Sequence, residues 1–236
     1  MLVSNTLRYA LARGISGLLN FAALVVFTRL LGKEGYGAYA LVLASVGLAY
    51  ATLYQWLSLA TLRLLHGNLA PRDAFLAAVR RAFLKVTVAV AGVAGVMLAF
   101  GGPALPAQTI LLGCVLLVVQ SWFELNLMIQ SADGRPLTYG VLAASRSLVC
   151  LVAGGGLALA GYGATGVLAG AALGFLLPGL VQAGRAWPAA RATREAPAIE
   201  RALVRYGAPL VATYMLDFVV SSSDRLLIGG ILGTAA

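Results

Sequence analysis

Residues 86–123 read VTVAVAGVAGVMLAFGGPALPAQTILLGCVLLVVQSWF and contain no Asp, Glu, Lys or Arg. As a single helix this run would be roughly 57 Å long, nearly twice the roughly 30 Å hydrocarbon core of a bilayer. Gly101, Gly102 and Pro103 interrupt the run near its middle, where they favour a tight turn. The stretch therefore predicts two membrane-spanning helices joined by a short connection.

Three other segments, 14–28, 35–62 and 147–184, are also free of charged residues. The last of them is broken by Gly161-Tyr162-Gly163, which predicts a second helical hairpin. The whole chain is 61% hydrophobic and only 11% charged, with a mean hydropathy of +0.91. Because an average soluble domain is about 25% charged, this chain cannot cover a water-facing surface and is predicted to be an integral membrane protein.

The predicted fold is all-α, with a six-helix transmembrane lobe followed by a seventh transmembrane helix. The lobe covers residues 1–185, a cytoplasmic linker covers 186–206, and the seventh helix lies in 207–236. Within the linker, Pro197 can start a helix whose Ile199 and Leu203 suit a membrane surface, and a solvated connection is the alternative interpretation. The expected spans are 10–30, 37–61, 80–100, 108–130, 138–160, 164–185 and 207–231.

Basic residues divide unevenly between the predicted loops. Thirteen lie in loops on the side of the N-terminus, and only Arg29 and Lys33 lie in loops on the other side. The positive-inside rule therefore predicts a cytoplasmic N-terminus. Because these loop residues account for the net charge of +9, we expect no nucleic-acid partner.

The two ends of the chain resemble each other. Leu31-Gly32 closes the first predicted span and Leu232-Gly233 closes the seventh, while Arg8-Tyr9 and Arg205-Tyr206 stand before them. This similarity suggests two parallel lobes related by an axis along the membrane normal. The chain is then expected to be an incomplete transporter that ends as its second lobe begins.

Three groups of motifs resemble those of a known membrane protein family. They are Phe27-Thr28-Arg29-Leu30-Leu31-Gly32 with Gly35-Tyr36-Gly37-Ala38-Tyr39, Gly134-Arg135-Pro136 with Tyr139-Gly140, and Arg205-Tyr206-Gly207-Ala208-Pro209-Leu210 with Ser223-Asp224-Arg225-Leu226-Leu227-Ile228-Gly229. On these motifs the chain resembles the polysaccharide exporters, or oligosaccharide flippases, of the multidrug/oligosaccharidyl-lipid/polysaccharide exporter superfamily.

The resemblance implies a flippase in the bacterial inner membrane. Such proteins move undecaprenyl-pyrophosphate-linked oligosaccharide from the cytoplasmic to the periplasmic face for surface polysaccharide assembly. The implied partners are this lipid-linked oligosaccharide, membrane lipids, and the missing C-terminal lobe or polysaccharide-assembly proteins. The family pattern includes further spans of the second lobe, which this chain lacks.

Polar residues inside the predicted spans are candidate contacts for a substrate headgroup. Arg13 and Asn20 share one helical stripe of the first span, and Arg13 either meets a pyrophosphate or anchors the helix at the interface. Arg146 in the fifth span and Arg225 in the seventh are the other predicted substrate-binding residues. Charged groups in hydrocarbon are costly, so they usually face a cavity or a partner.

Acidic residues in the spans are candidates for ion coupling. Glu124 either forms an ion pair with Arg146 or carries a coupling proton. Asp217 and Asp224 lie on one stripe of the seventh span, where they either bind a cation or proton or need charged partners in a second lobe.

Little in the sequence points to an enzyme. The acids are dispersed, the outward loops are short, and we predict no catalytic residue, no metal site and no cofactor. Cys114 and Cys150 are expected to pack as small apolar residues, and His66 has no metal-binding neighbour in the sequence. Alternatives to oligosaccharide export are a drug/cation antiporter or a peptidoglycan-lipid flippase of the same superfamily, and a nontransporting scaffold or pseudogene fragment.

Overall fold

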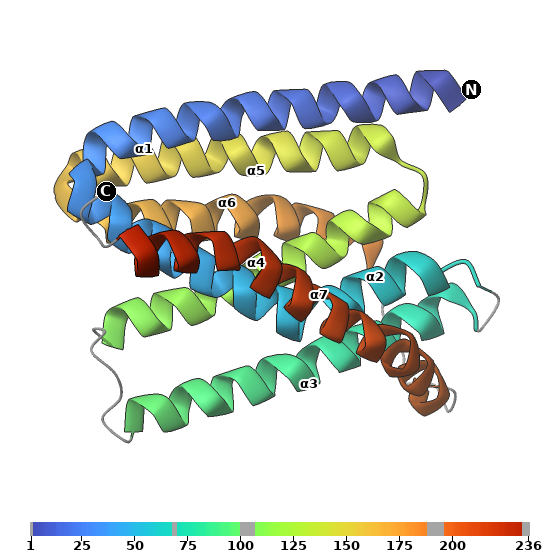
Figure 1. The fold of residues 1–236 in the computed structure, drawn as a ribbon. Coiled ribbons are helices and arrows are strands. Elements are labelled where there is room, and N and C mark those ends of the chain that lie inside the picture. The colour runs from blue at the N-terminus through green and yellow to red at the C-terminus, as the bar shows by residue number, and fades with distance from the viewer. Residues whose placement is uncertain (1, 68–69, 100–106, 188–195, 233–236) are drawn as a thin grey trace.

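The computed structural model is a bundle of long helices (Figure 1). It describes residues 2–67, 70–99, 107–187 and 196–232, except for the side chains of 2–13, 97, 107, 109, 184–186, 215 and 217–232. No strand occurs in this part of the chain. The elements are α1 (Leu2–Leu53), α2 (Gln55–Leu64), α3 (Arg72–Ala99), α4 (Ala107–Ala132), α5 (Pro136–Leu157), a π-helical turn η1 (Ala158–Tyr162), α6 (Gly163–Ala186) and α7 (Ala196–Leu232).

Helix α1 folds back on itself at Gly32, whose φ of 66° and ψ of −176° are not helical. A side chain at this φ would clash with the backbone, which is why glycine occupies the position. Phe27 before the kink meets Tyr39 after it, with ring centroids 5.9 Å apart. The first two predicted spans therefore meet directly at Gly32, with no separate loop at 31–36, and the second of them, 37–61, is interrupted at Tyr54 between α1 and α2.

Helices α5 and α6 form the second hairpin, as the glycines at 161 and 163 predicted. Both residues have positive φ, at 94° and 52°, and the chain reverses there without a loop. The two helices then lie in close contact along their length (Figure 1). The proposed break in 86–123 is confirmed as well, because α3 ends at Ala99 and α4 begins at Ala107.

The bundle has the surface of a membrane protein. Among the described residues, three helical stretches are long and apolar enough to cross a bilayer: Gly14–Leu53, Ile110–Ala132 and Pro136–Ala183. The first and last of these, 40 and 48 residues long, are the two hairpins. Large apolar side chains such as Leu18, Val88 and Leu159 are at least 71% exposed, as expected where lipid is the solvent. The count of seven spans stays a prediction.

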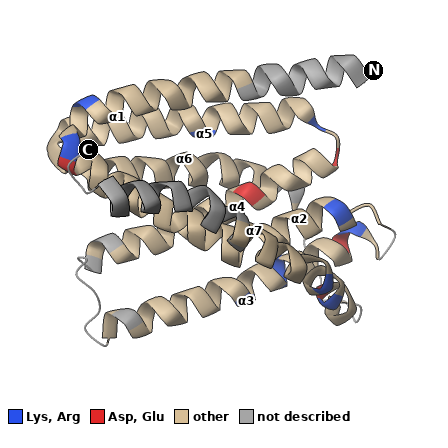
Figure 2. Ribbon diagram, viewed as in Figure 1, with Lys and Arg blue, Asp and Glu red and all other residues tan. Residues whose placement is uncertain are grey.

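Charged residues gather at the two ends of the helices (Figure 2). One end carries the 65–71 and 133–135 connections, the start of α3 and the start of α7, and we call it the basic end. The opposite end, called the far end, carries the Gly32 kink with Arg29, Lys33 and Glu34. This separation fits a bundle that lies across a bilayer, and the cytoplasmic assignment of the basic end stays a prediction.

Helix α7 begins within the segment predicted as a linker. Its first turns bury Ala196, Ile199 and Leu203 against α2 and α3, with exposed fractions of 3% or less. The amphipathic pattern at 196–206 was therefore correctly recognised, but its apolar face packs on protein. The interpretation of these residues as a solvated connection is therefore wrong, and a position of this helix at the membrane surface stays a prediction.

A charged contact fixes the same part of α7. The Glu200 carboxylate binds the Lys85 ammonium of α3, and its Oε1 lies 3.8 Å from Nε of Arg81. Two turns further on, Gly207 lies against the Trp56 ring of α2. The start of α7 is thus seated on the basic ends of α2 and α3.

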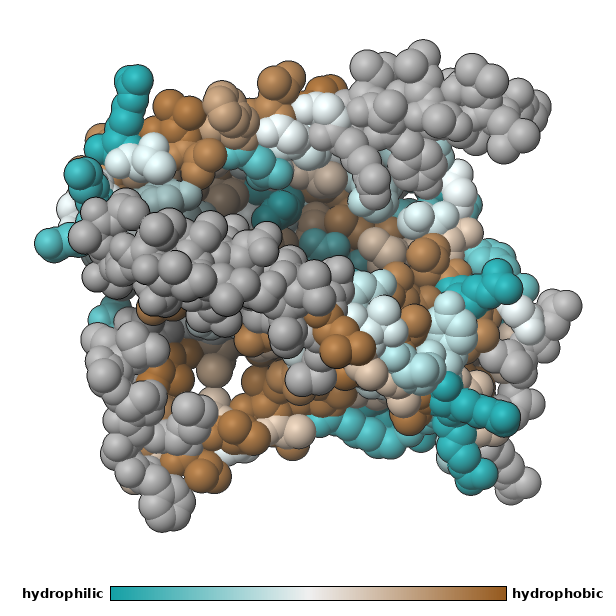
Figure 3. All heavy atoms as spheres, in the orientation of Figure 1, coloured by the Kyte–Doolittle hydropathy of each residue, from teal (hydrophilic) through white to brown (hydrophobic). Residues whose placement is uncertain are grey.

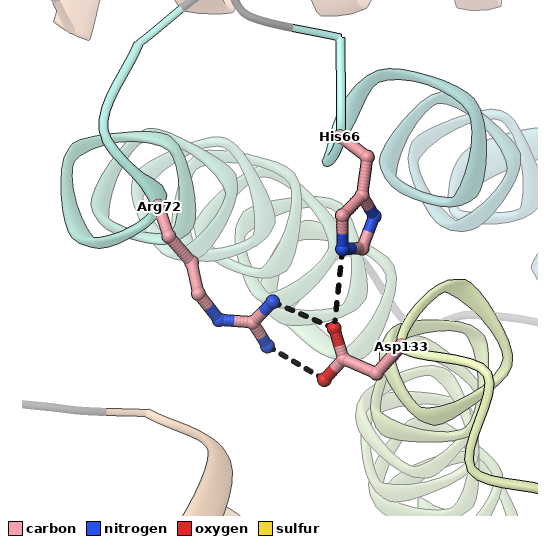
Figure 4. Close-up of polar contacts among 3 residues, drawn as sticks. All are labelled: His66, Arg72 and Asp133. Carbon is pink, nitrogen blue, oxygen red and sulfur yellow. Dashed lines mark hydrogen bonds and ion pairs between the residues drawn. The ribbon is translucent and has the colours of Figure 1, made fainter.

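A second charged contact ties two connections together at the basic end (Figure 4). Arg72 at the start of α3 donates two hydrogen bonds to Asp133, with N–O distances of 2.6 and 2.7 Å. His66 Nε2 lies 3.7 Å from the same carboxylate. Asp133 follows α4, so this cluster joins the α2–α3 connection to the α4–α5 connection.

Replacing Asp133 by Asn removes the charge from this cluster at almost constant size. We expect a loss of about 1 kcal/mol, because a bidentate arginine–carboxylate pair lies at the upper end of exposed ion pairs. Thermal unfolding of the purified protein in detergent, at low and high salt, measures the loss. The matched control is Glu34→Gln, which removes an exposed carboxylate at the far end. Equal melting of the two variants would contradict the assignment.

Candidate functional site

A polar cavity lies among the helices that the sequence predicted to be buried in lipid. It has a volume of about 360 Å³ and is lined by both halves of α1, by α4, α5 and α6. Figure 3 shows hydrophilic atoms recessed between the upper and lower helices on one face of the molecule. The lining residues are Asn20, Ala23, Leu24, Phe27, Tyr36, Tyr39, Leu43, Gln120, Arg146, Cys150, Ala171 and Phe175.

Arg146 is the cation of this cavity. It lies ten residues after the first residue of α5, about 15 Å along a helix and so about halfway across a bilayer. Its guanidinium carbon is 4.3 Å from the centre of the Phe175 ring, a cation–π contact that holds the group flat against α6. Its Nε is buried and has no hydrogen-bond partner. The guanidinium thus keeps donors available in the cavity.

Close packing of α5 on α6 fixes the position of Arg146. A Cβ atom at Gly174 would lie 2.8 Å from the Arg146 carbonyl oxygen and 3.0 Å from Cβ of Cys150. Only glycine permits this approach, which brings Phe175 under the guanidinium. Gly174 therefore serves both the packing of the two helices and the placement of the site.

Aromatic side chains line the cavity beside the polar groups. Tyr36 and Tyr39 follow the Gly32 kink, and their ring centroids are 5.8 Å apart. Phe27 packs on Tyr39 from the other half of α1. Sequence reasoning missed these three as cavity residues, although all of them stood in the quoted motif, because their meeting depends on how sharply α1 turns.

The structure brings together two of the four predicted substrate-binding residues. Asn20 and Arg146 line the same cavity, from α1 and α5. Gln120 of α4 joins them and adds an amide that can donate and accept hydrogen bonds. Arg13 lies in α1 and Arg225 in α7, and both side chains are outside the described part of the structure.

Glu124 lies one turn from Gln120 on α4 but does not line the cavity. Among the described ion pairs within 4.0 Å there is none between Glu124 and Arg146, so the static pair considered from the sequence is not formed. Asp217 and Asp224 lie in α7, and their side chains are outside the described residues.

The remaining groups show packing rather than chemistry. In the described residues no three of His, Cys, Asp and Glu lie close enough together to hold a metal ion. Trp122 stacks on Trp187 at 4.9 Å, and the Trp187 indole donates a hydrogen bond to Asn126. Cys114 and Cys150 are both unpaired thiols in the helices, and only Cys150 lines the polar cavity.

The two thiols give a direct test of the cavity. In the Cys114→Ala variant, a negatively charged methanethiosulfonate should modify Cys150 faster than a positively charged one, because Arg146 attracts the anion. An added Arg146→Gln change should remove this preference. The matched control is Cys150→Ala, whose remaining thiol should not discriminate between the reagents. Equal modification rates in Cys114→Ala, measured by mass spectrometry in detergent and corrected with free cysteine, would contradict the geometry.

Comparison with known proteins extends this description. The family model for polysaccharide biosynthesis proteins matches residues 2–236. The chain belongs to that family. The resemblance to polysaccharide exporters seen in the sequence motifs is thereby confirmed. Searches of curated proteins and of solved structures gave no match.

Membership of the polysaccharide biosynthesis protein family gives the cavity a context. A family match and an apolar helical bundle together describe a membrane protein of polysaccharide biosynthesis. Within that bundle the cavity offers one guanidinium, two amides and two phenol groups beside aromatic rings. These groups can pair with an anion and with hydroxyl groups, which are the functional groups of a sugar phosphate.

Proposed function

We propose that this chain belongs to a flippase that carries undecaprenyl-pyrophosphate-linked oligosaccharide across the bacterial inner membrane for surface polysaccharide assembly. The observation that carries the proposal is Arg146, a cation with free donors in a polar cavity about halfway across the bundle. Family membership supplies the link to polysaccharide. The protein acts as a transporter and catalyses no covalent step.

The chemistry of the substrate accounts for the cavity. Placing a guanidinium at the centre of a membrane helix costs about 3 kcal/mol, so a mid-membrane arginine needs a compensating role. Its planar fork can bind two oxygens of a phosphate group at once and keeps its charge when desolvated. Asn20, Gln120 and the two tyrosines then meet hydroxyl groups of the sugar next to the phosphate. Transient pairing with the headgroup lowers the cost of moving it through the lipid.

Transport follows from alternating access of this cavity to the two faces. The basic end faces the cytoplasm, where the substrate is made, and its arginines attract the anionic headgroup. Arg13 and Arg225 are further proposed contacts along the path, from α1 and α7. Glu124, Asp217 and Asp224 are proposed to couple movement to a proton or cation.

Deleting the gene tests the function. Surface polysaccharide should disappear while its lipid-linked precursor accumulates on the inner leaflet, and the chain expressed in its natural context should restore export. Efflux of cationic dyes should stay unchanged, since the cavity lining contains a cation and no carboxylate. Loss of dye efflux with normal polysaccharide would favour a drug/cation antiporter. Loss of viability with cell-wall precursor accumulation would favour a peptidoglycan-lipid flippase.

A further inference from the structure

A second space in the bundle is chemically the opposite of the polar cavity. It lies between α3 on one side and α1, α2 and α4 on the other, has a volume of about 580 Å³, and we call it the lateral slot. Its lining includes Ala49, Trp56, Val90 and Cys114. The slot and the cavity share no lining residue, although α1 and α4 contribute to both. The slot is therefore a separate site.

Apart from the Cys114 thiol, the slot presents apolar surface to a ligand. The Thr52 hydroxyl donates to the carbonyl oxygen of Leu48 at 2.7 Å, and the Trp56 indole N–H donates to that of Leu53 at 2.8 Å. Both polar groups are thus satisfied within their own helix turns and offer a ligand their apolar surfaces. A ligand that matches the slot needs no hydrogen-bonding groups along its length, which describes a lipid chain.

Helix α3 stands away from its neighbours beside this slot. Its Val88, Val93 and Val96 are 71%, 62% and 57% exposed, and they point in different directions around the helix. Figure 1 shows α3 diverging from the bundle towards its C-terminal end, and Figure 3 shows an opening in the surface there. Lipid chains are therefore expected to contact α3 on its slot-facing side as well as on its outer side.

The basic end of the slot carries a net positive charge. Lys85 precedes the slot residue Val86 and lies one turn before Ala89, which also lines the slot. Its side chain is 63% exposed even though its ammonium binds Glu200, and the Arg81 side chain is 39% exposed beside the same carboxylate. Two cations against one carboxylate leave a charge of +1 on α3 within the five residues that precede Val86, the first slot residue of this helix. An anionic headgroup complements this arrangement.

We infer that the lateral slot binds an anionic phospholipid, with one acyl chain between α3 and the α1–α4 wall and its phosphate beside Lys85 and Arg81. The bound chain fills the space that protein side chains leave open and supports α3 in its divergent position. This lipid is a bound component of the protein, distinct from any transported substrate. The inference is independent of the proposed function.

Trp56 supplies an internal probe of the slot. The variant Trp122→Phe/Trp187→Phe leaves Trp56 as the single tryptophan. In phosphatidylcholine vesicles, a small fraction of phosphatidylglycerol with brominated acyl chains should quench Trp56 more strongly than the same fraction of brominated phosphatidylcholine. Phosphatidylglycerol should be enriched over phosphatidylcholine beside Trp56 by about fivefold for each cation that its headgroup meets. Adding Ala94→Leu, which narrows the slot, should reduce quenching, and Ala91→Leu on the outer side of α3 should not.

The unaltered protein provides the second measurement. Native mass spectrometry after gentle detergent extraction should detect retained phosphatidylglycerol, which Arg81→Gln/Lys85→Gln should lose. Arg80→Gln, an exposed arginine with no ion pair among the described residues, is the matched control and should keep the lipid. Equal quenching by the two brominated lipids, or lipid retention unaffected by the double change, would overturn the inference.

Discussion

Export of surface polysaccharide should fall by roughly a hundredfold when Arg146 is replaced by alanine. Two charge-assisted hydrogen bonds from one guanidinium to a phosphate contribute about 3 kcal/mol, which corresponds to that factor in binding. Because Arg146 is the cation of the cavity lining, no other lining residue can take over the pairing. Arg146→Lys keeps the charge and loses the planar fork, so its export should lie between those of the wild type and the alanine variant.

The measurement is polysaccharide on the cell surface, normalised to the amount of protein in the membrane. Arg80→Ala is the matched control, since it removes an exposed arginine that does not line the cavity. Its export should stay at the wild-type level. Wild-type export by Arg146→Ala at wild-type membrane levels would remove the proposed headgroup site, and equal losses in both variants would reduce the effect to general surface charge.

Replacing Gly170 by alanine should separate α5 from α6 and destabilise the protein strongly. The added Cβ would lie 2.2 Å from the backbone nitrogen of Gly154 and 2.3 Å from its Cα. Backbone atoms cannot rotate away as a side chain can, so the helices must move apart. Overpacking of this kind costs about 3 kcal/mol, or about 10 °C in melting temperature for a chain of this size.

Gly156→Ala is the matched control, because a Cβ at that position meets nothing within 4 Å. Melting in detergent, followed by the monodisperse fraction that survives heating, should therefore fall for Gly170→Ala and stay constant for Gly156→Ala. The Gly170 variant should also lose the charge preference at Cys150, since displaced helices no longer hold Arg146 in place. Identical melting of the two variants would contradict the close approach.

Much of the fold followed from where apolar runs are interrupted. Gly161 and Gly163 stood in the middle of a run too long for one crossing, and the chain reverses there. The break between α3 and α4 was predicted for the same reason. The turn at Gly32 was expected to be a loop, because the charges at Lys33 and Glu34 suggest solvent. A single residue with positive φ is enough to reverse the helix, and hydropathy does not report how short a turn is.

Some residues of the candidate site could be predicted from the sequence, but the way in which they come together could not. Asn20 and Arg146 were identified because polar side chains inside a membrane span are costly and usually face a cavity or a partner. Their neighbours Tyr36, Tyr39 and Phe175 were not, since aromatic residues are ordinary in such helices and their meeting depends on helix packing. The same limit applies to α7, where the apolar residues Ile199 and Leu203 were recognised but were expected either at the membrane surface or in a solvated connection, and their packing on α2 and α3 was not predicted.

At the far end, the reversals at Gly32 and at 161–163 join one helix directly to the next, with no intervening loop. Each hairpin is closed there as tightly as backbone geometry permits, so its two arms cannot spread at that end without unwinding. The first hairpin and the α5–α6 hairpin must consequently each move as a rigid unit. Both contribute residues to the cavity lining. Any widening of the cavity then has to be a change in the angle between the two hairpins. The longer connections at the basic end would change conformation to accommodate it.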